Sequence, residues 1–270
     1  MDVDGLRWEV RTRGSGRPLL LVHGFTGRGT SWGAHTAAFA AVFRVIVVDL
    51  PGHGRTAATP NDPSRMSVER TADDLATILR RLDASPASVL GYSLGARVAL
   101  RLAVAHPESV ARLVLESPSA GIENPSDRDA RRAADEALAG RIERDGIAAF
   151  VAEWEAQPIF ATQAHLPAAR AAQIHRTRLA NRPQGLAASL RGAGQARMEP
   201  LHERLGDVSA PTLVIAGAVD DRGRPRAEAV ATTIPGARLE IVDGSGHTPH
   251  DERPIAFRRL ALDFLQEDAA

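Results

Sequence analysis

Cysteine and lysine are both absent from this chain of 270 residues. Without cysteine the chain can form no disulfide and no thiolate metal site, which is compatible with a reducing compartment. Without lysine, all 33 basic residues are arginines, and they balance 33 acidic residues. No overall charge therefore attracts nucleic acid or an anionic membrane, and we expect neither as a partner.

Long hydrophobic runs are also missing. The longest, such as residues 18–22 and 45–48, are far too short to span a bilayer and are typical of buried strands. The first residues lack the basic and apolar regions of a signal peptide, so we expect a cytoplasmic protein. No histidine spacing resembles a metal site, and we expect no metal and no cofactor.

Apolar runs of strand length alternate with helical patterns at both ends of the chain, but not in its middle. Strands are expected at 18–23, 43–49, 87–90, 112–115, 212–216 and 238–242, and helices at 68–82, 95–105 and 255–265. Between 121 and 204 only helical patterns occur, at 127–147, 168–179 and 184–190. This order predicts an α/β core with a mostly parallel sheet (1–120 and 205–270) and an inserted all-helical cap (121–204).

Gly91-Tyr-Ser-Leu-Gly95 has the pattern G-x-S-x-G and lies between an expected strand and an expected helix. In that context the pattern is typical of the nucleophile elbow of an α/β-hydrolase fold, which lifts a serine hydroxyl above the sheet. The turn is so tight that only small residues fit two positions either side of Ser93. We therefore expect a strained backbone at Ser93, with the positive end of the following helix beside it.

The partners of such a serine follow it in the order acid, then histidine. Asp220 follows the expected strand 212–216, and His247 follows the strand 238–242, so both lie where catalytic groups gather at strand ends. We predict His247 as the base and Asp220 as the acid that orients it. Asp221 is the main alternative acid, and Glu116, at the end of another strand, is a weaker one.

Two backbone N–H groups are needed to stabilise negative charge at the site. One belongs to the residue after the nucleophile, Leu94, and the other to the loop after an early strand, where we predict Phe25. His23, His53 and His250 lie near these loops, and we expect structural roles for them.

Four stretches of the chain resemble the 2-succinyl-6-hydroxy-2,4-cyclohexadiene-1-carboxylate synthases of menaquinone biosynthesis. They are residues 21–27, 49–54, 91–97, and the cap runs 154–160 with 186–190. The first two occur in many α/β-hydrolases. Arg97, two positions after the elbow, and the cap runs are more specific, and the resemblance extends from Leu20 to Leu265.

The resemblance implies a lyase, not a hydrolase. Such an enzyme expels pyruvate from 2-succinyl-5-enolpyruvyl-6-hydroxy-3-cyclohexene-1-carboxylate and uses the Ser–His–Asp set as a base. Because this small-molecule substrate carries several carboxylates, the resemblance implies that Arg97, Arg131 and Arg178 bind them. Tyr92 and Trp154 are the aromatic candidates for the pocket wall, although Trp154 equally suits packing between cap and core.

One departure from the family is Glu155, which stands beside Trp154 where some members have tyrosine. A carboxylate facing the pocket would repel an anionic substrate, so we expect Glu155 to face solvent. Two other functions remain open: a serine hydrolase (an esterase, thioesterase or carbon–carbon bond hydrolase) and a binding protein that has lost turnover. The hydrolase shares the triad but gives Arg97 no purpose, and the complete triad argues against the binding protein.

Overall fold

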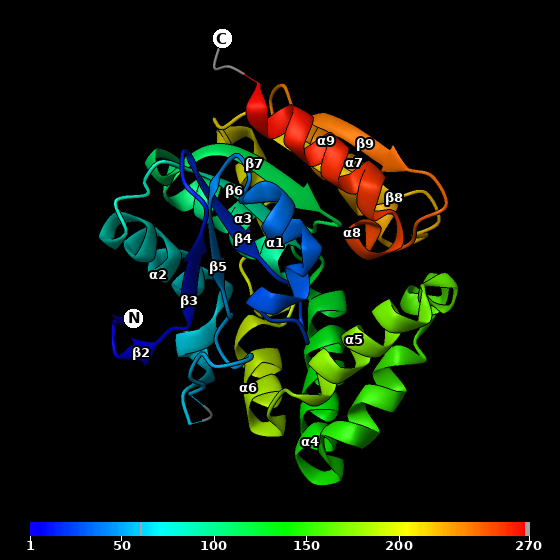
Figure 1. The fold of residues 1–270 in the computed structure, drawn as a ribbon. Coiled ribbons are helices and arrows are strands. Elements are labelled where there is room, and N and C mark those ends of the chain that lie inside the picture. The colour runs from blue at the N-terminus through cyan, green and yellow to red at the C-terminus, as the bar shows by residue number, and fades with distance from the viewer. Residues whose placement is uncertain (60, 268–270) are drawn as a thin grey trace.

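A seven-stranded sheet forms the centre of the computed structural model, which describes residues 1–59 and 61–267 (Figure 1). All its strands run parallel except β3, which pairs antiparallel with β5 at one edge. This confirms the predicted class. In spatial order the strands are β3 (Val10–Arg13), β5 (Arg44–Val48), β4 (Pro18–Val22), β6 (Ala87–Tyr92), β7 (Val110–Glu116), β8 (Thr212–Gly217) and β9 (Arg238–Val242).

Three strands at the N-terminus were not predicted. β1 (Asp2–Val3) and β2 (Leu6–Arg7) form a separate two-stranded sheet, and β3 lies at the edge of the main one. The first two are only two residues long, and three of the four residues of β3 are exposed. Short or exposed edge strands need no apolar run, so they leave no hydrophobic pattern to detect.

Helices cover both faces of the sheet. On one face, α2 (Val68–Arg81), α3 (Leu94–Ala105) and α7 (Gly223–Thr233) share a buried apolar cluster with the strands. On the other face, α1 (Ala34–Phe39) and α9 (Pro254–Gln266) do so through residues such as Phe39 and Phe257. The sequence patterns predicted α2, α3 and α9 but not α1 or α7. The short helices are η1 (Gly29–Trp32), η2 (Pro63–Met66), η3 (Pro107–Ser109), η5 (His202–Asp207) and α8 (Pro249–Glu252).

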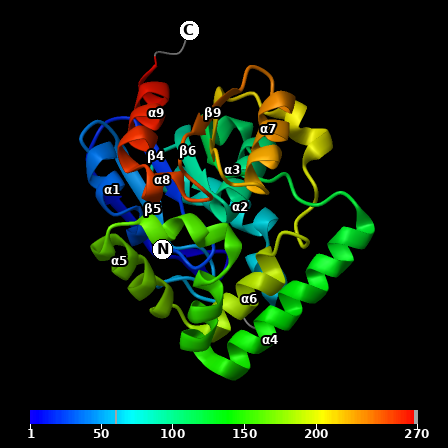
Figure 2. The same ribbon diagram turned by 90° about the vertical axis from the view of Figure 1, so that its right-hand side faces the viewer.

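The segment that we propose as the cap, residues 121–204, lies at the carboxyl ends of the strands (Figures 1 and 2). Its elements are α4 (Pro125–Glu155), η4 (Pro158–His165), α5 (Ala168–Leu179) and α6 (Pro183–Ala193). Helices α4 and α6 form a small apolar core through residues such as Ile142, Phe150 and Leu186, and Leu179 of α5 packs against it. Helix α4 continues beyond the predicted end at 147, but Gly146 interrupts it with φ 82°. None of the described helices is long and apolar enough to cross a bilayer.

Two glycines allow the cap to approach the core closely. A side chain on Gly185, at the start of α6, would collide with the backbone of Gly52, and the reverse is also true. Gly52 additionally has φ 79°, a conformation that favours glycine. The start of α6 therefore packs backbone to backbone against the loop after β5, which fixes where the cap lies over the strand ends.

Candidate active site

Ser93 lies in the turn between β6 and α3, with φ 51° and ψ −106°, as the elbow motif predicts. A side chain at Gly91 would collide with the backbone of Gly95, and one at Gly95 with the backbone of Val22. The turn can therefore form only with glycine at both positions. Its strain is offset by the surrounding sheet, and Ser93 caps the N-terminus of α3.

The structure brings Ser93, His247 and Asp220 together from three strand ends. His247 Nε2 lies 3.1 Å from Ser93 Oγ, and His247 Nδ1 lies 2.7 Å from Asp220 Oδ2. Because the carboxylate can only accept, Nδ1 carries the proton and Nε2 is free to accept from the serine hydroxyl. This chain of hydrogen bonds is suited to drawing a proton from Ser93.

The geometry also separates Asp220 from its two alternatives. Asp220 is buried, whereas Asp221 is exposed. Burial alone would raise the pKa of Asp220, but hydrogen bonds from His247 and from the Gly223 amide lower it below its usual value. Glu116 is fully buried and instead accepts hydrogen bonds at 2.8 Å from the backbone N–H and Nδ1 of His250.

The backbone amides of Phe25 and of Leu94, the residue after Ser93, have no hydrogen-bond partner among the described residues. The peptide that carries the Phe25 N–H is held by its carbonyl: His23 Nδ1 donates to Gly24 O at 2.7 Å, and the Gly27 amide donates to the same oxygen at 3.0 Å. His23 Nε2 in turn accepts from the Leu50 amide at 2.9 Å. Burial lowers the pKa of His23 to about 4, so the ring is neutral and its donor and acceptor are fixed.

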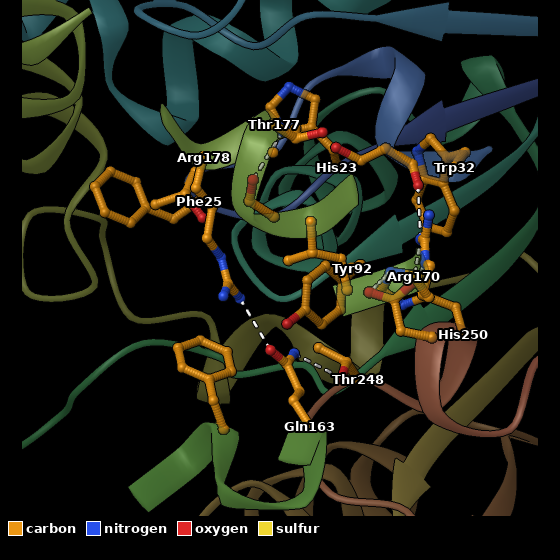
Figure 3. A pocket seen from close by; sticks show the side chains of 17 residues that line it. His23, Phe25, Trp32, Tyr92, Gln163, Arg170, Thr177, Arg178, Thr248 and His250 are labelled. Atoms are coloured by element: carbon orange, nitrogen blue, oxygen red, sulfur yellow. Dashed lines mark hydrogen bonds and ion pairs between the residues drawn. The ribbon is translucent and has the colours of Figure 1, made fainter. Parts of the chain in front are cut away.

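A cavity lies between the loop of residues 23–27, which follows β4, and the elements η4, α5 and α8 (Figure 3). Its walls include Phe25, Trp32, Tyr92 and Phe160, and its polar groups come from Gln163, Thr248, Arg170 and Arg178. Sequence reasoning placed Tyr92 here but missed Gln163 and Arg170, which carry no motif of their own.

Trp154 is not among the residues that line this cavity. Its ring packs against Phe25, Phe150 and Phe160, with centroids 5.3 to 5.6 Å apart. Its indole N–H is buried and has no hydrogen-bond partner among the described residues. Trp154 therefore supports the aromatic wall from behind.

Arg97 and Arg131 lie together, away from that cavity. Arg97 extends from α3 to the end of α6, where its Nη1 donates to Ala193 O at 2.9 Å. Arg131, on α4, pairs with Asp135 at 2.8 Å and donates to Gln195 Oε1 at 3.2 Å. Burial, and then the nearby Arg131 charge, lower the pKa of Arg97 to about 10. No carboxylate of the described residues lies within ion-pair distance of this partly buried cation, and the charges of Asp135 and Glu69 only partly oppose the lowering of its pKa.

Arg178 lies in the cavity, where it is only 7% exposed. Its Nη1 lies 3.0 Å from Glu155 Oε1, and its guanidinium stacks 4.8 Å from the centre of the Phe160 ring. The expectation that Glu155 faces solvent is therefore wrong. The expectation considered only repulsion between Glu155 and an anionic substrate, whereas in the structure Arg178 supplies a positive charge that holds this carboxylate.

The described residues contain no group of three or more side chains arranged to hold a metal ion. The described part of the site contains a hydrogen-bonded base system, two amides without a partner there, and several arginines.

Comparison with known proteins places this chain in a family. The family model described as the alpha/beta hydrolase fold matches residues 17–254. The chain is also 37% identical, over 97% of its length and 96% of the relative's, to a putative 2-succinyl-6-hydroxy-2,4-cyclohexadiene-1-carboxylate synthase from Bacillus subtilis strain 168. The chain belongs to the α/β-hydrolase family and, within it, to these synthases.

Solved structures of the α/β-hydrolase family give the same result. The structure of MenH from S. aureus is 31% identical, covers 96% of this chain and 97% of its own, and superposes with a TM-score of 0.91. The structure of a thermophilic esterase from Thermogutta terrifontis is 29% identical and has a TM-score of 0.84. The match covers 98% of this chain and 95% of the esterase chain. The synthase structure is therefore the more similar of the two.

Proposed function

We propose that this chain is a lyase that converts 2-succinyl-5-enolpyruvyl-6-hydroxy-3-cyclohexene-1-carboxylate into 2-succinyl-6-hydroxy-2,4-cyclohexadiene-1-carboxylate and pyruvate, in menaquinone biosynthesis. The synthase relatives support the reaction, and the cytoplasm is the proposed compartment. The observation that carries the proposal within the site is Arg97, a partly buried cation on the elbow helix that makes no direct ion pair with any carboxylate of the described residues. A site of this kind calls for a carboxylate on the substrate.

The proposed chemistry is a proton abstraction followed by elimination. His247 draws the hydroxyl proton from Ser93, whose oxygen removes a proton from a ring carbon. The electron pair left on the ring forms the new double bond as the carbon–oxygen bond to the enolpyruvyl group breaks. The departing enolate takes up a proton at carbon and becomes pyruvate, so no acyl-enzyme is formed.

The remaining candidate residues bind and stabilise. The amides of Phe25 and Leu94 donate hydrogen bonds to the enolate-like charge that develops in the transition state. Arg97 and Arg131 hold one carboxylate of the substrate, and Arg178 lies where it can meet another. Tyr92 lines the cavity beside His247, with ring centroids 5.6 Å apart.

The first experiment is to measure pyruvate release from the enolpyruvyl substrate, generated in situ, beside hydrolysis of a neutral p-nitrophenyl ester. Fast pyruvate release that disappears in Ser93→Ala, with feeble ester cleavage, is the expected result. Brisk ester cleavage without pyruvate would overturn the proposal and leave a serine hydrolase, the activity named for the esterase of the same fold.

A further inference from the structure

Arg97 differs from the two arginines that line the cavity, because no carboxylate of the described residues pairs with it directly. Both arginines of the cavity are bound to internal carboxylates. Arg170 Nε donates to Asp251 Oδ1 at 2.8 Å, and Arg178 pairs with Glu155 at 3.0 Å. Within the part of the chain that the structure describes, the Arg97 guanidinium donates to a carbonyl and a thioether, while Asp135 and Glu69 act on it only through their charges. An incoming carboxylate therefore finds an open cation at Arg97 but an occupied one at Arg178.

The two members of the Arg178–Glu155 pair are held to different degrees. The side chain of Arg178 is 8% exposed and is fixed by the Phe160 ring and by Gln163 Oε1, 3.3 Å from Nη2 (Figure 3). The side chain of Glu155 is 29% exposed, and its second oxygen is bound to His175, which lies on the exposed face of α5. Glu155 can therefore swing towards solvent while Arg178 stays in place.

We infer that Glu155 determines specificity: it occupies Arg178 as an internal carboxylate, which a second carboxylate of the substrate must displace. The inference rests on the proposed function, since it concerns how a polycarboxylate enters that site. It separates the cations of the site into an open position at Arg97 and an exchangeable one at Arg178. A ligand with one carboxylate needs no exchange, whereas a ligand with two must release Glu155.

Because Glu155 must be released first, Arg178 binds a second carboxylate of the ligand more weakly than it would if Glu155 carried no charge. A bond between guanidinium and carboxylate forms only as an equivalent one breaks, so the gain is nearly cancelled. Gln at position 155 keeps an acceptor oxygen for Arg178 but removes the negative charge. The remaining neutral hydrogen bond is roughly half as strong and is displaced more easily.

The test uses 2-succinylbenzoate, which carries one carboxylate on an aromatic ring and one at the end of the succinyl chain, as the proposed product does on its cyclohexadiene ring. Its dimethyl ester is the neutral control. Binding to the full chain is measured by calorimetry in wild type, Glu155→Gln and Glu153→Gln. Glu153 is a matched control, because it lies on the same helix and pairs with Arg141, outside the cavity. We expect Kd for the diacid to fall about 10-fold in Glu155→Gln and to stay unchanged in Glu153→Gln, with the diester unaffected in both.

Further variants test whether the effect of Glu155→Gln on Kd acts through Arg178. In an Arg178→Gln background, adding Glu155→Gln should leave Kd for the diacid unchanged, since no cation remains to be freed. Glu155→Asp, which keeps the charge but shortens the reach by one methylene, should tighten binding in the same direction by less. If Glu155→Gln weakened or did not change binding of the diacid, Glu155 would position Arg178 rather than occupy it, and the inference would be overturned.

The outcome is independent of turnover. If wild type released no pyruvate, the proposed lyase function would fail while the calorimetric difference between diacid and diester still reported on Glu155. If pyruvate were released normally and Glu155→Gln had no effect on Kd, only the inference on Glu155 would fail.

Discussion

Replacing Arg97 by methionine should separate binding of carboxylate substrates from the chemistry of the triad. Methionine fills a similar volume with an unbranched apolar chain, and it adjoins Met198, whose Sδ lies 3.8 Å from Arg97 Nη1. The variant removes the cation, and we expect Ser93, His247 and the oxyanion amides (the backbone N–H groups of Phe25 and Leu94) to keep their positions. Besides the charge, the variant removes the hydrogen bond from Arg97 to Ala193 O, so hydrolysis of a neutral ester serves as the reference for effects other than carboxylate binding.

The size of the effect follows from the kind of bond that is lost. A hydrogen bond to a charged group contributes about 1.5–3 kcal/mol, which corresponds to a loss of roughly 10- to 150-fold in kcat/KM for pyruvate release. Stability should change little. The variant leaves Ala193 O without its donor, at a cost of about 1 kcal/mol, but it also removes a partly buried cation that makes no direct ion pair with a carboxylate of the described residues.

The assay compares kcat/KM for pyruvate release with the residual hydrolysis of a neutral p-nitrophenyl ester, alongside denaturant unfolding. Arg101→Met, one turn further along α3, is the control, because Arg101 pairs with the exposed Glu199 at 2.9 Å. It should change kcat/KM less than about twofold, as expected for a surface ion pair. An equal loss of ester hydrolysis in Arg97→Met would refute the assignment of Arg97 to carboxylate binding.

Three further predictions concern the base system and the buried histidines. Ser93→Ala should lower kcat for pyruvate release by at least about 10³-fold with an unchanged circular dichroism spectrum; a smaller loss would mean that another group takes the proton. Asp220→Asn should lower kcat by about 10³- to 10⁴-fold, because an amide does not hold His247 in the required tautomer; a stopped-flow measurement that found normal turnover would contradict this. Burial lowers the pKa of His23 to about 4 and those of His35 and His53 to about 3. The unfolded chain therefore binds more protons below the usual histidine value of 6.5, and stability that is complete above that pH is lost as the pH falls towards the folded values. Each histidine contributes up to about 1.4 kcal/mol per pH unit. His35→Gln should reduce the slope of unfolding free energy against pH by that amount between pH 4.5 and 6, and an unchanged slope would argue against a neutral buried His35.

The positions of Ser93, Asp220 and His247 could be predicted because each follows an apolar strand that the sequence marks clearly. Parallel strands end at the same edge of a sheet, so three residues far apart in the chain are placed together by topology alone. The choice between Asp220 and Asp221 needed the structure. Strand ends are marked to within a residue or two, and that margin is as large as the difference between the two aspartates.

The cap was less predictable, for a physical reason. Its outline follows from helical periodicity, but the direction in which a cap side chain points depends on breaks such as Gly146 and on how α4 packs against α6. Glu155 was expected in solvent because it would repel an anionic substrate, but it lies against Arg178, whose charge offsets that repulsion. Arg170 and Gln163 could not be found at all, because they meet only when η4 and α5 fold over the same cavity.

The catalytic residues and the arginines proposed to bind the substrate lie on different parts of the fold, which separates the chemistry from substrate recognition. Ser93, Asp220, His247 and the two oxyanion amides all lie on turns of the core, where the sheet holds them rigidly. Most of the charges proposed to meet the substrate lie on cap helices, where substitution leaves the triad undisturbed. Arg97 alone joins the two, since it arises from the core helix α3 and donates to a carbonyl at the end of α6. Movement of α6 would therefore move the partner of Arg97 as well, which makes the carboxylate position depend on how the cap lies over the core.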